Sequence, residues 1–440
     1  MEWGSEQAQA VFETLDGAFD GDVAVAVTAI DADGPAFRRS ARLPEDARFE
    51  IGSITKTMTA TLLASLVGDG VLALDDEIGR WLDAGTNADI TLEQLATHTS
   101  GLPRLAPNQP TEETNPYRDF TAKRAEEGLR ATTRTPEAGH VYSNFGYQLL
   151  GLVLERASGH GYQDLLAQRL LRPLGMKNSG VGAAGGGTRI SGHAGGKPAG
   201  HWDHALAGPG AVEATIGDLA RYLSASLAPP SGPLGAAIRL CQQPRVRMGG
   251  GSAGGLAWII TGGLLFHNGG TGGFSASVAI DQAAGHAVGA LVSNHGRSVS
   301  LLDAAVITAA SGGDPRNARP QGAVETAGPQ WERRASDLAQ ALLDGKFTEI
   351  HQKLRPEGQA KLSAERIGQM WQFALQQIGD PGPVSVSSRS LVSGAAASGQ
   401  VAALITFSGS KQPLRLLVRF ASSGQIASLR VLAPDEAPPW

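Results

Sequence analysis

The sequence has 440 residues, with 42 acidic and 37 basic side chains, a formal net charge of −5 and 42% hydrophobic residues. This length suffices for two or three domains with a sizeable core, and the composition is that of a folded chain. The lack of a basic surplus argues against a nucleic-acid partner, the single cysteine excludes an internal disulfide and a cysteine-rich metal site, and no apolar run is long enough to span a membrane.

The first elements are a helix over residues 5–19 and a strand over residues 22–30, which is rich in β-branched side chains. A second strand is expected around Phe37. A helical pattern then runs from Ser53 to about Val67 and ends at the glycines that follow. The chain opens without a basic segment followed by an apolar stretch, so we expect no signal peptide in this sequence.

The middle of the chain, residues 75–245, is dominated by helical patterns with little strand signal. The clearest helices are expected over 91–97, 118–130, 144–157, 162–171 and 215–227. Strand signal resumes over 255–261, 263–267, 274–281 and 286–293, and a helix follows over 299–311. Short turns between these strands favour an antiparallel meander. The pattern predicts a sheet built from both ends of the unit, with a helical insertion between them.

The remainder of the chain is expected to be a small C-terminal α+β accessory domain. We predict one domain over residues 1–312, a linker over 313–330 and the accessory domain over 331–440. Helices are expected over 331–344 and 363–378, and strands over 400–408, 413–421 and 425–432. A pairing of two chains through this domain is a possible homo-oligomer contact.

One candidate for chemistry is the segment Gly52-Ser53-Ile54-Thr55-Lys56, where a strand-like stretch meets a helix. Ser53 and Lys56 are three residues apart, so they share a face of a helix. A serine hydroxyl needs a neighbouring base to become a nucleophile, and a lysine can supply it if burial lowers the pKa of the amine. Alone, this spacing is also typical of an ordinary capped helix start.

Two further segments add polar groups suited to acyl transfer. Tyr142-Ser143-Asn144 supplies a phenol that can relay protons and an amide that can orient a substrate. Residues 267–274, His-Asn-Gly-Gly-Thr-Gly-Gly-Phe, lie between two expected strands. Small residues there let a substrate lie along the strand edge, and the Gly270 N–H could pair with that of Ser53 as an oxyanion hole.

In this order, the three segments resemble the serine β-lactamase-like superfamily of class C β-lactamases, serine D,D-peptidases, D-aminopeptidases and family VIII-type esterases. Further matches lie in Phe49–Lys56, Leu95–Pro103, Tyr142–Gly151 and the stretch from Ala207 to Ala220. The resemblance covers roughly residues 5–312. It implies an α/β (α+β) β-lactamase/transpeptidase-like fold, with an antiparallel sheet flanked by helices.

The resemblance also implies roles for single residues. Ser53 matches the nucleophile that forms an acyl-enzyme, and Lys56 matches the lysine that deprotonates or polarises it. Tyr142 matches a tyrosine described as general base and proton shuttle. Asn144 matches the asparagine that contacts the substrate amide, and the Gly270 N–H matches the second oxyanion donor.

His267 stands where class C β-lactamases have a lysine, and with Asn268 and Gly269 it belongs to the expected substrate-binding segment. Histidine at this place is more typical of the peptidases, aminopeptidases and esterases. The lysine of class C β-lactamases helps to hold a substrate carboxylate, whereas a histidine is mostly neutral at pH 7. The resemblance therefore implies weaker turnover of β-lactams.

We accordingly predict a serine acyl hydrolase that acts on β-lactam, D-amino-acid amide or peptide, or ester substrates, without a cofactor or a metal. The alternatives are a short-chain carboxylesterase with little β-lactam turnover and a non-catalytic ligand-binding homologue. The expected partner is a small-molecule or peptide substrate, and the family implies a periplasmic or secreted location.

Two other patterns are weaker. His201 and His204 have a spacing that suits a metal pair, but no third ligand group is evident, so solvated loop histidines are favoured. Gly250-Gly251-Ser252-Ala253-Gly254 fits the nucleophile-elbow pattern, which requires a strand before it and a helix after it. Here an apolar strand-like stretch follows Ser252, so we do not expect it to be the nucleophile.

Overall fold

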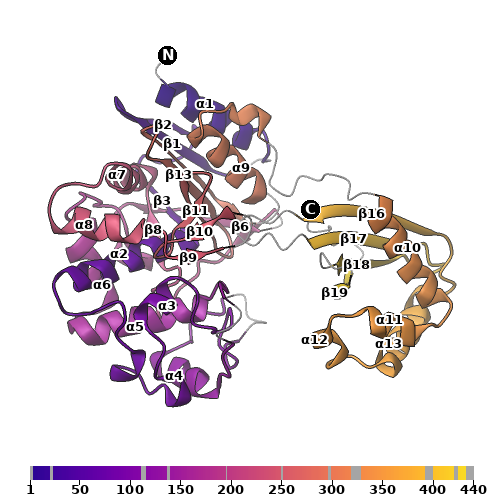
Figure 1. Ribbon diagram of the computed structural model, residues 1–440. Helices are drawn as coiled ribbons and strands as arrows, with labels where there is room; N and C mark the ends of the chain where they lie inside the picture. Colours follow the sequence, from indigo (N-terminus) through magenta and orange to yellow (C-terminus); the bar gives the residue numbers. More distant parts are fainter. Residues whose placement is uncertain are drawn as a thin grey trace. The chain divides into compact units, whose positions relative to one another are not determined.

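The computed structural model describes residues 3–19, 23–110, 115–135, 139–194, 196–248, 251–295, 299–318, 329–391, 400–420 and 425–432. The chain forms two compact units, Met1–Pro320 and Gln321–Trp440 (Figure 1). Residues 319–328 of the expected linker lie outside the described residues. None of the described helices has the length and apolar character that a membrane crossing requires.

The main sheet of the first unit contains eight of the described strands, in the order β2-β1-β14-β13-β12-β11-β10-β9. These strands are β1 (Val25–Asp31), β2 (Gly34–Arg39), β9 (Val246–Arg247), β10 (Ala253–Gly254), β11 (Ile259–Thr261), β12 (Leu264–Gly270), β13 (Ser275–Asp281) and β14 (His286–Val292). β1 pairs antiparallel with β14, and the strands from β9 to β14 form a meander. Both features confirm the predicted sheet, built from the two ends of the unit.

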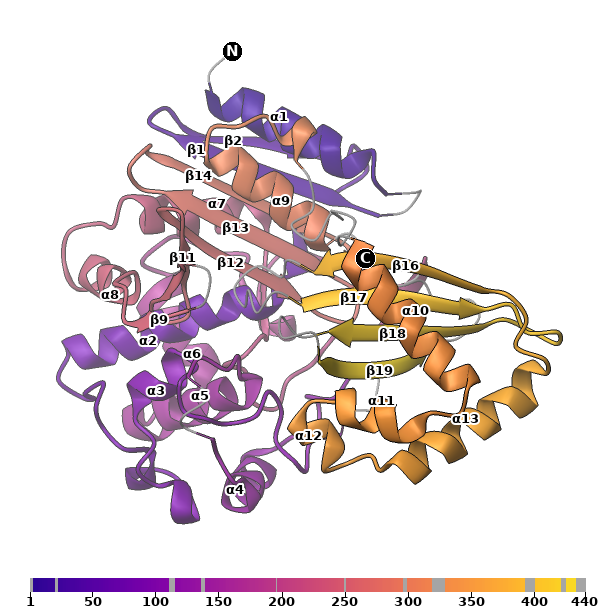
Figure 2. The ribbon, with the colours of Figure 1, turned by 45° about the vertical axis from the view of Figure 1, so that its right-hand side comes forward.

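Helices cover both faces of this sheet. α1 (Trp3–Asp16) and α9 (Val299–Ala310) lie across one face, as Figure 2 shows. Their apolar side chains form a core with alternate residues of the strands, including Val25, Val27 and Val288. The other face packs against α7 (Ile216–Leu227), in a second, larger core that also contains side chains of α2 (Thr55–Gly68). The mixture of helices with an antiparallel sheet confirms the predicted fold class.

The insertion between β2 and β9 is mostly helical, as predicted. Its further α-helices are α3 (Leu92–Ala96), α4 (Ala122–Ala131), α5 (Asn144–Ser158), α6 (Tyr162–Leu166) and α8 (Pro233–Cys241), and its 3-10 helices and π-helical segment are η1 (Gly52–Ile54), η2 (Ile78–Arg80), η3 (Gly85–Asn87), η5 (Ala167–Leu171) and η6 (Gly182–Ala184). It also contains the short strands β3 (Ala47–Glu50), β4 (Gly180–Val181), β5 (Thr188–Arg189), β6 (Gly192–Ala194), β7 (Lys197–Ala199) and β8 (Val212–Ala214). These strands are two to four residues long, too short for a period-of-two pattern to stand out in the sequence.

After β14, the first unit contains the short strand β15 (Asn294–His295) and, beyond α9, η8 (Pro315–Asn317). The second unit is a four-stranded sheet with helices packed against it. Its helices are α10 (Pro329–Leu343), α11 (Phe347–Lys353), α12 (Pro356–Gln359) and α13 (Ala364–Ile378), and its strands, in spatial order, are β16 (Val384–Leu391), β17 (Gln400–Phe407), β18 (Leu414–Phe420) and β19 (Ile426–Leu432). Figure 2 shows α10 lying across the sheet. Of these elements, α11, α12 and β16 were not predicted.

One backbone approach joins β12 to η1. A Cβ atom added at Gly269 would lie 2.0 Å from the carbonyl oxygen of Ile51, and one added at Gly52 would lie 2.6 Å from the nitrogen of Gly270. Gly52 also has a φ of +49°. Only glycine fits at both places, because a side chain on either would force the two backbone segments apart.

We expect Gly269→Ala to destabilise the fold, since its methyl group has no room against the Ile51 carbonyl. The loss should be about 1–3 kcal/mol in the free energy of unfolding, measured by urea denaturation. Gly68→Ala is the control, because Gly68 lies at the end of α2 with nothing within 4 Å of an added Cβ. Alanine there should leave stability unchanged or raise it slightly. Equal behaviour of the two variants would contradict the proposed close approach.

Candidate active site

Ser53 lies in η1, between the end of β3 and the start of α2, at the junction predicted from the sequence. β3 is fully buried and delivers the chain into the core, and α2 continues directly from η1. Ser53 is therefore at the N-terminal end of a helix, where free N–H groups and the helix dipole favour negative charge. Its side chain is half-buried.

Lys56 is completely buried and directs its amine at Ser53. The Nζ atom donates to Ser53 Oγ at 2.9 Å and to the carbonyl oxygen of Pro209 at 2.7 Å. Burial holds the pKa of Lys56 well below its usual value, and the nearby charge of Arg104 lowers this pKa further. An amine that is neutral in this position can accept the Ser53 proton.

Tyr142 completes a three-residue group with Ser53 and Lys56. Its side chain is hydrogen-bonded to Ser53, and the Lys56 Nζ lies 4.9 Å from the centre of its ring. Burial raises the pKa of Tyr142 to about 12, which the hydrogen bond with Ser53 partly offsets. The resting phenol therefore keeps its proton, so the Lys56 amine is the one of these two side chains that can accept a proton.

Asn144 begins α5, and its amide faces the same region. Ser143 caps this helix by accepting from the N–H of Gly146, which fixes the position of the next residue. The Asn144 amide donates to the hydroxyl of Tyr117 at 2.8 Å, while its Oδ1 is buried without a partner in the described part of the chain. This oxygen is a free acceptor suited to a substrate N–H.

Gly269 and Gly270 bring the edge of β12 to Ser53. Thr271 donates to the carbonyl of Phe274 across the turn into β13. Because backbone groups alternate in direction along an antiparallel strand, the Gly270 N–H points to the opposite edge, on the side of Gly52. An oxyanion near Ser53 could therefore accept from both the Ser53 and the Gly270 amides.

His267 lies on the same face of β12 as Gly269 and is 2% exposed. Its Nδ1 is 2.6 Å from the carbonyl oxygen of Asn268, so this nitrogen carries the hydrogen. Burial lowers the pKa of His267 to about 3. His267 is therefore neutral at physiological pH and supplies no fixed positive charge.

Asn268 belongs to the expected substrate-binding segment, but its side chain is directed away from Ser53. Successive residues of a strand point to opposite faces, so Asn268 faces α9 while His267 faces the α2 side. Its amide donates to Oδ2 of Asp303 at 2.6 Å. The Asn268 side chain thus joins the sheet to α9 and does not meet Ser53.

Three ring side chains near the site form a group that the sequence analysis did not predict. The ring of Tyr117 stacks on that of His204 with centroids 4.6 Å apart and lies 5.3 Å from that of Trp202. A Cβ atom at Gly272 would meet the Trp202 ring at 2.4 Å, so this aromatic group extends from Asn144 to the turn after β12. Loops bring these rings together, and no spacing in the sequence announces it.

His98 has a structural contact with the site. It has a positive φ of 60°, an uncommon conformation for a residue other than glycine, and its Nδ1 accepts from the Ser143 N–H at 3.0 Å. Its ring lies 4.5 Å from that of Tyr142. Burial holds the pKa of His98 well below its usual value, consistent with an unprotonated acceptor. His98 therefore helps to fix the segment from Tyr142 to Asn144.

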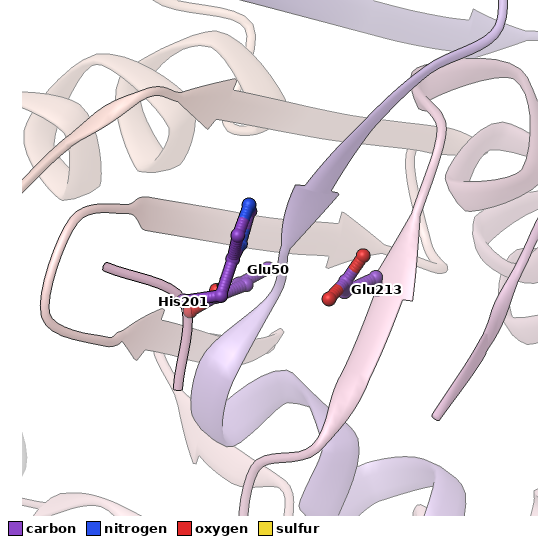
Figure 3. A group of neighbouring side chains, drawn as sticks. All are labelled: Glu50, His201 and Glu213. Atoms are coloured by element: carbon purple, nitrogen blue, oxygen red, sulfur yellow. The ribbon is translucent and has the colours of Figure 1, made fainter. Parts of the chain in front are cut away.

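A second cluster of titratable groups lies just before Ser53. Figure 3 shows Glu50 at the end of β3, Glu213 on β8 and His201 from the intervening loop. Their ligand atoms all lie within 4.8 Å of one another, which would suit a metal ion. His201 is therefore part of a group that the sequence did not indicate, and it does not pair with His204.

The charges of this cluster argue against a metal. Arg189 donates to both oxygens of Glu213, at 2.8 and 3.0 Å, and Arg48 lies 3.4 Å from the same carboxylate. Glu50 accepts from His201 Nδ1 at 2.7 Å and from the Trp202 N–H at 3.1 Å. Two guanidinium groups already balance the two carboxylates, so a divalent cation would add uncompensated charge. The cluster instead ties β3 and β8 to the loop that carries Trp202.

Comparison with known proteins now identifies the family. The family model described as Beta-lactamase matches residues 15–311. The chain belongs to the Beta-lactamase family. This result confirms the resemblance inferred from the three sequence segments.

Three curated relatives are each 32% identical to the chain over a limited region. Penicillin-binding protein 4* of Bacillus subtilis (strain 168) matches over 143 residues, 32% of each chain. The D-alanyl-D-alanine-carboxypeptidase/endopeptidase AmpH of Escherichia coli (strain K12) matches over 182 residues, 36% of this chain and 45% of the relative. The esterase EstB of Burkholderia gladioli matches over 177 residues, 35% and 43%. The matched region spans a third to less than half of these relatives.

Two solved structures show the same fold at 20% identity. The β-lactamase/D-alanine carboxypeptidase from Pseudomonas syringae has a TM-score of 0.57 and covers 66% of this chain and 94% of its own. The class C β-lactamase from Rhodobacter sphaeroides has a TM-score of 0.59 and covers 70% of this chain and 97% of its own. At this identity, the likeness supports the architecture alone.

The lowered pKa of Lys56 predicts how stability depends on pH. In the unfolded chain the amine has an ordinary pKa of about 10.4, so between the folded and unfolded values the unfolded chain binds more protons. Stability should therefore fall as the pH falls from 10, by up to about 1.4 kcal/mol per pH unit from this group. Lys56→Met removes the group, and its advantage over the wild type should grow between pH 10 and pH 8.

Urea denaturation across this pH range measures the effect. Lys177→Met is the control, because Lys177 is exposed, and its stability should follow that of the wild type. Parallel pH curves for Lys56→Met and the wild type would show that Lys56 is charged in the folded protein.

Proposed function

We propose that this protein is a serine acyl hydrolase that forms a covalent acyl-enzyme on Ser53. The observation that carries the proposal is the buried amine of Lys56, 2.9 Å from Ser53 Oγ and without a carboxylate partner among the described residues. Such an amine has little structural value, because burying a lysine costs free energy unless its charge is lost or paired. Its placement against a hydroxyl at a helix start suits nucleophile activation.

The reaction follows from the positions of the three residues. Lys56 accepts the proton of Ser53 as Oγ attacks the substrate carbonyl carbon, and the N–H groups of Ser53 and Gly270 stabilise the oxyanion. As the bond to the leaving group breaks, Tyr142 donates its proton to the departing atom and is reprotonated by Lys56. Water then attacks the ester by the reverse sequence, which releases the acid and restores the serine hydroxyl.

The substrate carbonyl belongs to a β-lactam, a D-amino-acid amide or peptide, or an ester. The neutral His267 supports peptidase or esterase activity over efficient β-lactam turnover, because the segment lacks the fixed cation of class C β-lactamases. The free Oδ1 of Asn144 supports a substrate with an N–H group. Relatives named as a carboxypeptidase and an esterase agree with this range. A periplasmic or secreted location stays a prediction from the family.

Ser53→Ala should abolish hydrolysis of a chromogenic ester and leave the fold intact, because Ser53 is the serine whose hydroxyl is hydrogen-bonded to the Lys56 amine. The same variant should form no adduct with a penicillin in intact-protein mass spectrometry. Ser252→Ala is the matched control: Ser252 lies in the Gly-x-Ser-x-Gly pattern, but its hydroxyl donates to Thr261 in the β10–β11 hairpin. Full activity of Ser53→Ala would disprove the proposal.

The mass experiment also separates the substrate classes. A lasting penicillin adduct on the wild type indicates acylation without efficient deacylation, as in a penicillin-binding or peptidase-like enzyme. Consumption of the penicillin without a lasting adduct indicates a β-lactamase. If neither occurs while the ester is hydrolysed, ester and D-peptide substrates are favoured.

Tyr142→Phe tests the proton relay. We expect the turnover of an ester with a poor leaving group to fall by roughly 10²-fold or more, since the departing oxygen loses its proton donor. An activated nitrophenyl ester, whose leaving group needs no proton, should be affected much less. Equal losses with both esters would assign Tyr142 a structural role, which thermal unfolding of the variant would then show.

A further inference from the structure

Arg104 brings a positive charge to the rim of the site. It follows Leu102 and Pro103, and its side chain is exposed. The guanidinium carbon lies 5.3 Å from the centre of the Tyr142 ring. Tyr142 is hydrogen-bonded to Ser53, so only the Tyr142 side chain separates the Arg104 charge from the proposed nucleophile. The sequence analysis gave no role to this residue.

The backbone of Arg104 is fixed against the start of α5. Its carbonyl oxygen accepts from the N–H groups of Asn144 and Phe145, at 2.9 and 3.1 Å. The hydroxyl of Ser143 also donates to the carbonyl of Pro103, at 2.6 Å. Arg104 therefore keeps its position relative to Tyr142 and Asn144, although its side chain reaches solvent.

The charge of Arg104 is not neutralised within the described part of the chain. No carboxylate there lies within ion-pair distance of it, whereas many other arginines of the first unit have such a partner. Lys56 and His267 are both buried in settings that disfavour their charged forms. Arg104 is thus the cation that the site offers to a ligand.

We propose that Arg104 is a specificity-determining residue that binds an anionic group, such as a carboxylate, on the leaving portion of the substrate. Arg104 is assigned to the leaving portion because its guanidinium lies over the ring of Tyr142, the residue proposed to protonate the leaving atom. This inference rests on the proposed acyl-transfer function of Ser53. It moves the recognition of a negative charge from His267 on β12 to the loop before α4.

A simpler role for Arg104 makes a different prediction. If its charge acts only on Lys56 and Tyr142, its removal changes the reaction with every substrate by the same factor. If it binds an anionic leaving group, its removal changes the preference between a charged and a neutral substrate of the same shape. The ratio of two kcat/KM values therefore distinguishes the two roles.

Two esters of matched shape provide this ratio: 3-carboxyphenyl butyrate and 3-carbamoylphenyl butyrate, which differ by one charge. We expect Arg104→Met to lower the charged-to-neutral ratio of kcat/KM by about tenfold or more, since a hydrogen-bonded ion pair is lost. Arg104→Lys should restore part of the ratio, and added salt should lower it in the wild type. Arg80→Met, which removes an exposed arginine outside the site, is the control and should keep the wild-type ratio.

Binding to Ser53→Ala tests the same point without turnover. By titration calorimetry, 3-hydroxybenzoate should bind this variant more tightly than 3-hydroxybenzamide, and Arg104→Met in the same background should remove the difference. An unchanged ratio of kcat/KM, or equal binding of acid and amide, would overturn the assignment of Arg104. Ester hydrolysis that depends on Ser53 would then still support the proposed function, so the two hypotheses fail separately.

Discussion

The hydrogen bond from Lys56 to Ser53 is the interaction on which the rest of the site depends. An ammonium could also donate this hydrogen bond, but only an uncharged amine can accept the serine proton, and burial favours the uncharged form. α2 provides this burial because nearly every side chain along it is buried, so Lys56 lies in the core of the unit. Its Nζ also donates to the carbonyl oxygen of Pro209, which accepts a hydrogen bond without supplying a full negative charge. The surrounding core therefore sets the chemistry of the amine.

The second constraint is the close approach of two backbone segments that are distant in sequence. η1 belongs to the first part of the chain, and β12 comes more than 200 residues later. The sheet brings them together because β1 pairs with β14, so the meander that contains β12 folds back beside the N-terminal strands. Gly52 and Gly269 then allow a contact that no side chain would tolerate. The proposed oxyanion site is a consequence of this topology.

Much of this arrangement could be predicted from the sequence, because it depends on local patterns. The strands of the meander and the main helices have clear periodicity, and Ser53, Lys56, Tyr142 and Asn144 lie within distinctive segments. Asn268 shows where such reasoning fails. It is a neighbour of His267 in the sequence, but the alternation of strand side chains directs it to Asp303 on α9. A motif indicates which segment lies near the site, whereas the alternation of side chains along the strand determines which of its residues face the site.

Contacts between short strands and between loops could not be predicted from the sequence, for a different reason. Glu50 and Glu213 meet only because β3 pairs with β8, and Arg189 joins them from β5, so no single segment contains the cluster. Tyr117 and His204 stack across two loops that have no regular period. The same holds for Arg104, whose contact with Tyr142 depends on hydrogen bonds between its own backbone and the start of α5.

The charge states of Lys56, His267 and Arg104 depend on one another. A cation buried near Lys56 would lose free energy on burial unless a carboxylate were placed beside it. Such a carboxylate would also favour the charged form of Lys56. Because His267 is neutral, the site contains neither an unpaired buried charge at this position nor a carboxylate to balance it. The side chain of Arg104 is exposed, so its charge remains hydrated, and this charge still lowers the pKa of Lys56. The exposed Arg104 therefore leaves the buried Lys56 uncharged and provides one positive charge that a ligand can bind.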